Sequence, residues 1–325
     1  MKNENLHKAK VAKNDEFYTR LQDIENELRH YRNHFKGKVV YCNCDDARES
    51  NFFKYFSLNF EFLGLKKLIT TGYKENGKGV ALVYEGDKNG NRNVDDEEIS
   101  VTELNGNGDF RSEECIEFLK EADIVVTNPP FSLFREYVAQ LMQYGKKFLI
   151  IGNMNAITYK EIFPYIKNNE LWMGYKSLGS DMFFNVPQNY VEELKATKTQ
   201  GGGWRELDGI IMGRVATACW FTNLEHNKRN EELILYKHYN PTEYPKYDNY
   251  DAIEVSKVAE IPMDYEGVMG VPISFLDKYC PNQFRILGIM SGAKGETFTN
   301  GNDNRAKFYL NGKGVYARIL IQKIN

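Results

Sequence analysis

Short apolar segments alternate with amphipathic helical segments along roughly the first 170 residues of this chain. The apolar segments have the composition of buried strands and lie at 38–42, 65–71, 122–127 and 147–152. Parallel strands need crossover connections, which helices usually supply, so this alternation is typical of a parallel sheet covered by helices. The pattern therefore predicts an α/β fold with a doubly wound sheet. A polar segment between the second and third strands adds a hairpin with strands at 80–84 and 99–104.

The second part of the chain has a different character. Beyond about residue 225 it carries five spaced prolines among many Tyr and Asn residues, which favours short α+β elements. We therefore predict two domains, a core at 1–225 and a smaller α+β region at 226–325. Within the core, the segment 191–213 contains three consecutive glycines and is expected to be an inserted mobile loop.

Composition excludes several classes of protein. The net charge is −3, so a nucleic-acid-binding function would need a local basic patch, of which the lysines of the N-terminal arm are one candidate. The five cysteines include no CxxC pair and the five histidines form no ligand pattern, so neither a metal site nor a disulfide framework is expected. The polar N-terminus and the lack of a long apolar run predict a cytoplasmic protein.

The strongest chemical signal is the tetrapeptide Asn128-Pro129-Pro130-Phe131, which directly follows the strand ending at Thr127. An exocyclic amine conjugated to a purine ring is a poor nucleophile, and acceptors that hold its hydrogens make its lone pair available. The amide oxygen of Asn128 and a carbonyl near Pro129 can be those acceptors. The two prolines hold the turn rigid because each fixes φ, and Phe131 offers a ring to an extruded base.

Several other turns are expected to lie at the same edge as this tetrapeptide, because ligands of such sheets bind outside the carboxyl ends of the strands. These turns are 43–51, 70–73, 109–110 and 153–155. Two further features could contact a nucleic acid: Trp204-Arg205 with Arg214, which could enter a groove, and Phe183 with Phe184, which could form a second wall of a base pocket. A surface loop and ordinary core packing explain these two features equally well.

Motifs spread over nearly the whole chain resemble the EcoRI-type adenine methyltransferases, and 128–131 resembles the catalytic motif of amino-group DNA methyltransferases. The motifs that carry the resemblance are Lys13–Thr19, Tyr41–Asp46, Ser50–Phe56, Gly108–Ser112, Thr127–Ser132, Lys246–Ile253 and Gly267–Ile273. The resemblance implies a Rossmann-like methyltransferase sheet with a smaller α+β DNA-recognition region at 226–325. It implies Asn128, Pro129, Pro130 and Phe131 as the catalytic residues.

The resemblance also implies the residues that bind S-adenosylmethionine. The segment Phe17-Tyr18-Thr19 resembles the motif that closes over the methionine part of this cofactor. In the loop after the first strand, where a carboxylate normally meets the cofactor's ammonium group, the matching residues are Asn43, Asp45, Asp46, Ser50, Asn51 and Phe52. Asp109 matches the acid that accepts from the cofactor's adenine amine, and Phe110 matches the ring stacked nearby.

Two positions depart from the pattern of ordinary methyltransferases. The first loop has no glycine between Asp45 and Asn51, and the second strand, 67–71, lacks the acid that usually binds the ribose hydroxyls. EcoRI-type enzymes share both departures, so they are interpreted as features of that subfamily.

The resemblance implies an adenine-specific, site-specific DNA methyltransferase of a restriction-modification system that acts on a flipped adenine in double-stranded DNA. It implies a cytoplasmic, nucleoid-associated enzyme that is a monomer or a weak dimer, with a cognate restriction endonuclease that forms no stable complex with it. Two alternatives stay open: an RNA or protein-glutamine methyltransferase that uses the same Asn-Pro-Pro-Phe turn, and a non-catalytic DNA-binding relic.

One acidic segment imitates a calcium-binding loop. Its oxygen-bearing side chains follow the ligand spacing of such loops from Asp87 to Glu98. Arg92 occupies the position where glycine normally makes a sharp turn, and no flanking helices are predicted. The sequence therefore favours a solvated acidic hairpin without a metal.

Overall fold

The computed structural model describes residues 18–44, 46–290 and 308–324, which form two compact units. Unit 1 comprises Met1–Met154 and Gly179–Leu224, and unit 2 comprises Asn155–Leu178 and Glu225–Asn325. The second stretch of unit 2 starts at Glu225, where the alternation of strands and helices in the sequence gives way to a Pro- and Tyr-rich segment. The segment 155–178, which the sequence places in the core, groups with unit 2 instead.

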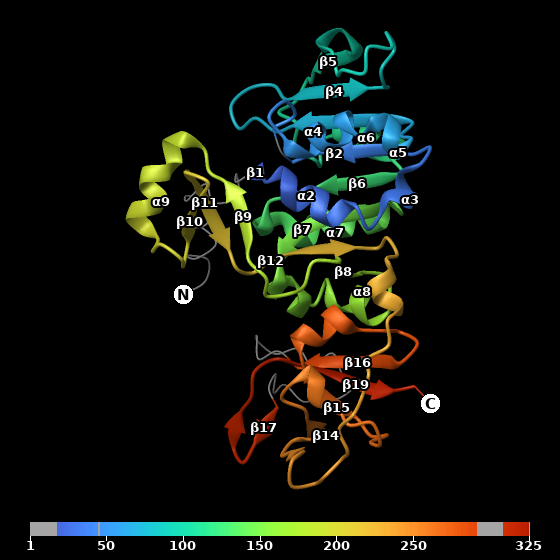
Figure 1. The fold of residues 1–325 in the computed structure, drawn as a ribbon, viewed down its shortest axis with the longest axis vertical. Helices are drawn as coiled ribbons and strands as arrows, with labels where there is room; N and C mark the ends of the chain where they lie inside the picture. The colour runs from blue at the N-terminus through green and yellow to red at the C-terminus, as the bar shows by residue number, and fades with distance from the viewer. Residues whose placement is uncertain (1–17, 45, 291–307, 325) are drawn as a thin grey trace. The chain divides into compact units, whose positions relative to one another are not determined.

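Unit 1 is built on a large mixed sheet (Figure 1). Its central strands run parallel in the order β3 (Lys67–Gly72), β2 (Val39–Cys42), β6 (Ile124–Thr127) and β7 (Lys147–Asn153). Antiparallel strands extend both sides of this centre: β4 (Val80–Tyr84) and β5 (Ile99–Glu103) beyond β3, and β12 (Ala218–Thr222) beyond β7. The predicted parallel centre and the hairpin are both present, and the sheet as a whole is mixed.

Side-chain alternation along β2 shows that both faces of this sheet are covered. Val40 and Cys42 belong to the main core cluster with α2 (Leu21–Leu28) and α4 (Asn51–Leu58). Tyr41 points to the other face, where its ring meets Phe118 of α6 (Glu113–Glu121). The remaining helices of unit 1 are α3 (Arg32–Phe35), α5 (Phe60–Leu63), α7 (Phe134–Gln143) and α9 (Val191–Thr197).

A second, smaller sheet of unit 1 has the strand order β1 (Tyr18–Thr19), β9 (Met182–Asn185), β11 (Ile210–Val215), β10 (Trp204–Leu207). The expectation of a loop over 191–213 is therefore wrong, because this segment contains α9 and a β-hairpin. The hairpin turns at Asp208-Gly209, where both residues have positive φ, and Leu207 pairs with Ile210. An Asp-Gly pair of this kind is the preferred two-residue hairpin turn, and it was present in the sequence as a signal.

Unit 2 contains a five-stranded sheet with the strand order β13 (Lys246–Tyr247), β14 (Tyr250–Glu254), β15 (Met269–Pro272), β19 (Arg318–Lys323), β16 (Phe284–Met290). It also contains α8 (Phe163–Lys167), the short strand β8 (Trp172–Met173) and a small hairpin of β17 (Tyr309–Leu310) and β18 (Lys313–Gly314). The described strands of unit 2 are short, from two to seven residues, as the spaced prolines predict. In the part of the chain that is described, no helix is long and apolar enough to cross a membrane.

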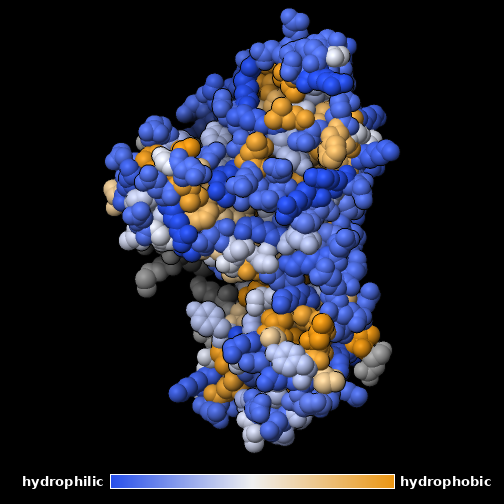
Figure 2. All heavy atoms as spheres, viewed as in Figure 1, coloured by the Kyte–Doolittle hydropathy of each residue, from blue (hydrophilic) through white to orange (hydrophobic). Residues whose placement is uncertain are grey.

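The viewed face of unit 1 carries apolar surface only as separate spots among hydrophilic side chains (Figure 2). The most exposed large apolar side chains of unit 1 are Leu58 on α4 and Phe62 on α5. These side chains lie outside the turns that the sequence assigns to the site.

Candidate active site at the carboxyl edge of the sheet

The turns after β2 and β6 lie side by side. Val40 pairs with Ile124 and Tyr41 with Val125, and beyond them the Thr127 hydroxyl donates a hydrogen bond to the carbonyl of Asn43. The chain then turns through Asn128 and the two prolines, and a short 3-10 helix begins at Phe131. Pro129 is buried, whereas Asn128, Pro130 and Phe131 are partly exposed. The turn is thus anchored from below, and the Asn128 residue is partly exposed although its amide oxygen Oδ1 is buried.

Tyr137, on the helix that follows this turn, connects three of the site segments. Its hydroxyl donates a hydrogen bond of 2.5 Å to Oδ1 of Asn43, and its ring packs edge-on against Phe110 at 4.9 Å. Gln140 of the same helix donates to the carbonyl of Phe110 at 3.2 Å. Complete burial raises the pKa of Tyr137 well above its usual value, so the phenol stays protonated and remains a donor.

The Asp109 carboxylate is held by Arg111. Arg111 Nε and its backbone N–H both donate to Oδ1, each at 2.9 Å, and Nη2 donates to Oδ2 at 2.6 Å. This contact lowers the pKa of Asp109, so its carboxylate stays ionised. Since a carboxylate offers about four acceptor sites, the three bonds leave one for a ligand, and the side chain is 25% exposed.

Backbone contacts bring Asp109 to the end of β3. Gly108 has φ +81, and a Cβ there would lie 2.3 Å from the carbonyl oxygen of Gly72, so only glycine fits. The N–H of Lys74 also donates to the carbonyl of Asn107 at 2.9 Å. The turns after β2, β3 and β6 and the Asp109 segment therefore meet at one edge.

The first loop keeps its shape without glycine. Cys44 adopts φ +68, the left-handed conformation that glycine usually supplies. Asp46 Oδ1 accepts from the backbone N–H groups of Arg48 and Glu49, and Ser50 caps α4 by accepting from the N–H of Phe52. Asp46 is exposed at the surface of this loop, and Asp45 lies outside the described residues.

Strand β1 is attached to the start of α4. Asn51 Nδ2 donates to the carbonyl of Thr19 at 2.8 Å, and Thr19 pairs with Phe184 of β9. The Thr19 hydroxyl is buried and has no hydrogen-bond partner among the described residues. Phe17, the first residue of the expected cofactor motif, lies outside the described residues.

Several aromatic residues singled out in the sequence are part of the core. Phe52 is fully buried and packs edge-on against Trp220 at 6.3 Å, and Phe110 is 5% exposed. Phe184 is also buried in the main core, so its side chain supports the site from below. Phe183 is partly exposed, and its ring lies between the guanidinium groups of Arg20 and Arg205 at 5.5 and 5.6 Å.

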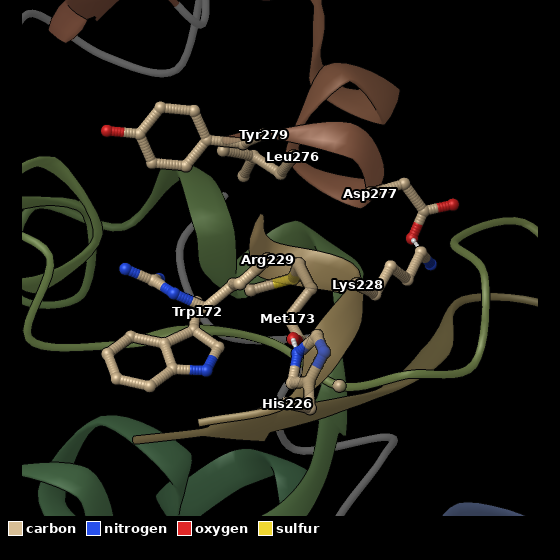
Figure 3. A pocket seen from close by; sticks show the side chains of 9 residues that line it. Trp172, Met173, His226, Lys228, Arg229, Leu276, Asp277 and Tyr279 are labelled. Carbon is tan, nitrogen blue, oxygen red and sulfur yellow. Dashed lines mark hydrogen bonds and ion pairs between the residues drawn. The ribbon is translucent and has the colours of Figure 1, made fainter. Parts of the chain in front are cut away.

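A separate pocket lies within unit 2 (Figure 3). Arg229 stacks over Trp172 at 3.7 Å and lies 3.4 Å from the carboxylate of Glu225. Lys228 donates to the carbonyl of Tyr175 and to Asp277, which in turn accepts from the N–H of Leu178. These contacts join the segment 155–178 to the later part of unit 2, which explains why the two group together.

Sequence reasoning missed Tyr137, Arg111 and Thr127 as parts of the site. The sequence placed Tyr137 only on the apolar face of a predicted helix, and that face is expected to pack on the sheet. Arg111 was visible two residues after Asp109, a spacing at which an arginine can fold back onto the acid. Thr127 belongs to the motif Thr127–Ser132, but the motif gives no role to its hydroxyl, which bonds the neighbouring turn.

Comparisons with known proteins show which family the chain belongs to. A sequence model of the family described as adenine-specific methyltransferase EcoRI matches residues 5–324. The chain is 49% identical over 330 residues to the type II methyltransferase M.EcoRI of Escherichia coli, covering 98% of this chain and 96% of that protein. It is 40% identical over 328 residues to the type II methyltransferase M.MgeORF184P of Mycoplasma genitalium, covering 98% of both. No solved structure matches it significantly. The chain belongs to the family of EcoRI-type adenine-specific DNA methyltransferases.

Proposed function

We propose that the chain transfers a methyl group from S-adenosylmethionine to the N6 amine of an adenine flipped out of duplex DNA, as the modification enzyme of a restriction-modification system. The observation that carries the proposal is the rigid turn Asn128–Phe131 at the carboxyl end of β6, anchored beside the Asn43 loop. Ligands of open α/β sheets bind at this edge.

The residues at the edge suit the cofactor. S-adenosylmethionine carries an ammonium group, a carboxylate, a sulfonium and an adenine amine. Asp109 has one acceptor site left for the adenine amine. Asp46 offers a carboxylate in the first loop, and Asp45 precedes it in the sequence. The buried Thr19 hydroxyl, which has no partner among the described residues, can bond a polar group of the methionine part. Tyr18, Asn43, Ser50 and Asn51 position these groups, while Phe52 and Phe110 pack beneath them.

Asn128 acts on the acceptor amine. Its side-chain oxygen and the carbonyl of Pro129 accept the two N6 hydrogens, which turns the nitrogen lone pair out of conjugation and toward the methyl donor. The cofactor, when bound, supplies a methyl group on a positively charged sulfur. With the amine held by Asn128 and Pro129, the protein would need no strong general base, because the N6 proton released on methylation would pass to water.

The adenine has to leave the helix because its amine is paired inside the duplex. Extrusion costs a few kcal/mol, and stacking on an aromatic ring returns about 1–3 kcal/mol per base. Phe131 is partly exposed directly after the turn, which makes it the ring best placed for stacking. We assign DNA-sequence recognition to residues 226–325, where irregular segments such as 255–268 connect the short strands of unit 2.

The experiment offers unmodified duplex DNA, RNA and a glutamine-containing protein in parallel and analyses the products for N6-methyladenine and for methylglutamine. Duplex DNA alone should be methylated. Asn128→Ala should slow single-turnover transfer by about 10²–10³-fold, as loss of one oriented polar group does in other enzymes. Asn128→Asp, which keeps the acceptor oxygen, should be less impaired, and cofactor binding should survive in both. Methylation of RNA or protein instead of DNA would overturn the proposal.

A further inference from the structure

The loop that joins β4 to β5 places oxygen-bearing side chains at the spacing of a calcium-binding loop. In a 12-residue loop of that kind, side chains at positions 1, 3, 5, 9 and 12 and a backbone carbonyl at position 7 coordinate the ion. Counting from the first carboxylate, the corresponding residues are Asp87, Asn89, Asn91, Asn93, Asp95 and Glu98. The proposed methyl transfer and DNA recognition assign no role to this loop.

The sequence raises two objections: an arginine at position 6, where calcium loops carry glycine, and the lack of flanking helices. The structure removes the first, whereas strands flank the loop as the sequence predicts. Arg92 has φ +65, the left-handed conformation that this position requires, and its N–H donates to Asp87 Oδ2 at 2.7 Å. Asp87 Oδ1 accepts from the N–H of Gly90 at 2.6 Å, so the chain turns around the carboxylate at position 1. Val94 packs against the core of unit 1 and anchors the loop.

The polar side chains within the turn face the same carboxylate. The amide groups of Asn89 and Asn91 donate to Asp95 Oδ2 at 2.8 and 2.6 Å. Positions 3, 5 and 9 therefore already meet, with amide nitrogens where an ion would require oxygens. Rotation of each amide about its last side-chain bond presents the oxygen instead.

Glu98 supplies an independent observation. This side chain is only 9% exposed, and its Oε1 accepts from the N–H groups of Lys88 and Asn89 at 2.7 and 3.1 Å, so the carboxyl group points into the loop. Its other oxygen, Oε2, is buried and has no hydrogen-bond partner among the described residues. A buried carboxylate oxygen without a partner is costly, and a cation at position 12 of the loop would satisfy it.

We propose that the loop 87–98 binds a calcium ion. Binding draws the carboxylates of Asp87, Asp95 and Glu98 inward, since no three His, Cys, Asp or Glu side chains in the described part of the chain are placed to share an ion as they stand. A flexible loop with several oxygen ligands suits Ca²⁺ better than Mg²⁺, which demands a compact octahedron.

The affinity is expected to be modest. Without flanking helices to preorganise the loop, the dissociation constant should lie in the weak class of calcium modules, about 10⁻⁴–10⁻³ M. The ion would tie together the ends of β4 and β5, where Tyr84 pairs with Ile99. Millimolar Ca²⁺ should then stabilise the hairpin by mass action.

The experiment titrates the chelator-treated full-length protein with CaCl₂ by calorimetry and follows amide hydrogen exchange of residues 80–103. Glu98→Gln removes the charge at position 12, and Glu97→Gln removes the same charge at an exposed position that is not a ligand. Wild type and Glu97→Gln should bind Ca²⁺ with similar affinity and gain protection in the hairpin. Glu98→Gln should bind at least about tenfold more weakly.

Absence of binding in the wild type, or an equal loss in both variants, would overturn the proposal. So would displacement of Ca²⁺ by equimolar Mg²⁺. If Glu98→Gln fails to fold, Asp95→Asn tests the same site at position 9, and it should also weaken binding while Glu97→Gln does not.

Discussion

Unit 1 and unit 2 each contain a cluster of polar side chains, but the two clusters are closed to different degrees. At the edge of the large sheet, Thr127 and Tyr137 bond to Asn43 from below and leave Asn128 and Asp109 partly exposed. In unit 2, Glu254 is 5% exposed and receives Arg318 through Nε at 3.0 Å and Nη2 at 2.6 Å, and the Tyr247 hydroxyl also donates to it.

The comparison distinguishes two roles of buried polar side chains, a structural role and a ligand-binding role. The unit 2 cluster satisfies itself, because each charged group faces an opposite charge or a donor inside the protein. In the unit 1 cluster, Asn43 accepts hydrogen bonds from Thr127 and Tyr137 inside the protein. The carboxylate of Asp109 keeps an acceptor site at the surface. A closed cluster fixes a structure, whereas an open one can bind a ligand. Substitutions should therefore affect stability in unit 2 and methyl transfer in unit 1.

The largest effect on stability is expected from Arg318→Met. The substitution leaves Glu254 buried without its countercharge, which typically costs about 3–5 kcal/mol. Urea unfolding followed by circular dichroism measures this loss. The matched control is Lys246→Met, which breaks the exposed ion pair with Asp251 and should cost at most about 1 kcal/mol. The double variant Arg318→Met/Glu254→Met should recover most of the stability. Equal losses in the two single variants would contradict the assignment of a closed cluster.

The second effect concerns the base and not the fold. Phe131→Ala should weaken productive DNA binding by about 1–3 kcal/mol, because the flipped adenine loses its stacking partner. The fluorescence of 2-aminopurine at the target position should fall toward that of free duplex, and the unfolding midpoint should also fall somewhat because Phe131 packs against the main core cluster. Phe62→Ala, which removes a ring that is 69% exposed on α5, serves as the control. A bright probe in the Phe131→Ala complex would show that the base leaves the helix without this ring and would contradict the role given to Phe131.

A smaller effect is expected from Tyr137→Phe. The variant keeps the ring that packs against Phe110 but loses the donor to Asn43, so the free energy of unfolding should fall by about 1 kcal/mol. The transfer rate should fall with it, because the Asn43 loop and the Asn128 turn are linked through Thr127. A variant with unchanged transfer and unchanged stability would show that this hydrogen bond does not shape the site.

The sequence predicted those helices and strands whose structure depends mainly on their own residues. The strand before Asn128 and the hairpin strands at 80–84 and 99–104 were predictable because apolar and alternating runs are local signals. Contacts made by distant residues were not predictable. Nothing near Tyr137 indicates that its hydroxyl reaches Asn43, because the two residues are 94 positions apart in sequence and the chain between them decides where they meet.

The same limit explains the errors. Three consecutive glycines at 201–203 suggested a loop, yet pairing of β11 with β9 fixes the hairpin that follows them. Likewise, Phe52 and Phe110 matched a cofactor motif, but a motif cannot tell whether a ring faces the ligand or the core. Cys44 and Arg92 take left-handed conformations that their residue types disfavour. At Arg92, a hydrogen bond from the backbone N–H to Asp87 stabilises this conformation.

The smallest expected effect is the pH dependence of the Asp109–Arg111 contact. Arg111 lowers the pKa of Asp109, so the contact contributes stability above the ordinary carboxyl pKa of about 3.9, and this contribution is lost as the pH falls through the lowered value. Arg111→Met should therefore reduce the free energy of unfolding by less than about 1 kcal/mol, since the arginine is 45% exposed. The difference from wild type should be constant between pH 8 and pH 5, and it should shrink only below about pH 4.

Cofactor binding in the wild type should likewise show no titration between pH 5 and pH 8. Urea unfolding at a series of pH values checks the first expectation, and calorimetry checks the second, with Arg48→Met as an exposed control that should give no pH-dependent difference. If the difference between Arg111→Met and wild type decays between pH 7 and pH 5, then a group with a higher pKa than Asp109 governs the contact, and the carboxylate assigned to the cofactor's amine is the wrong one.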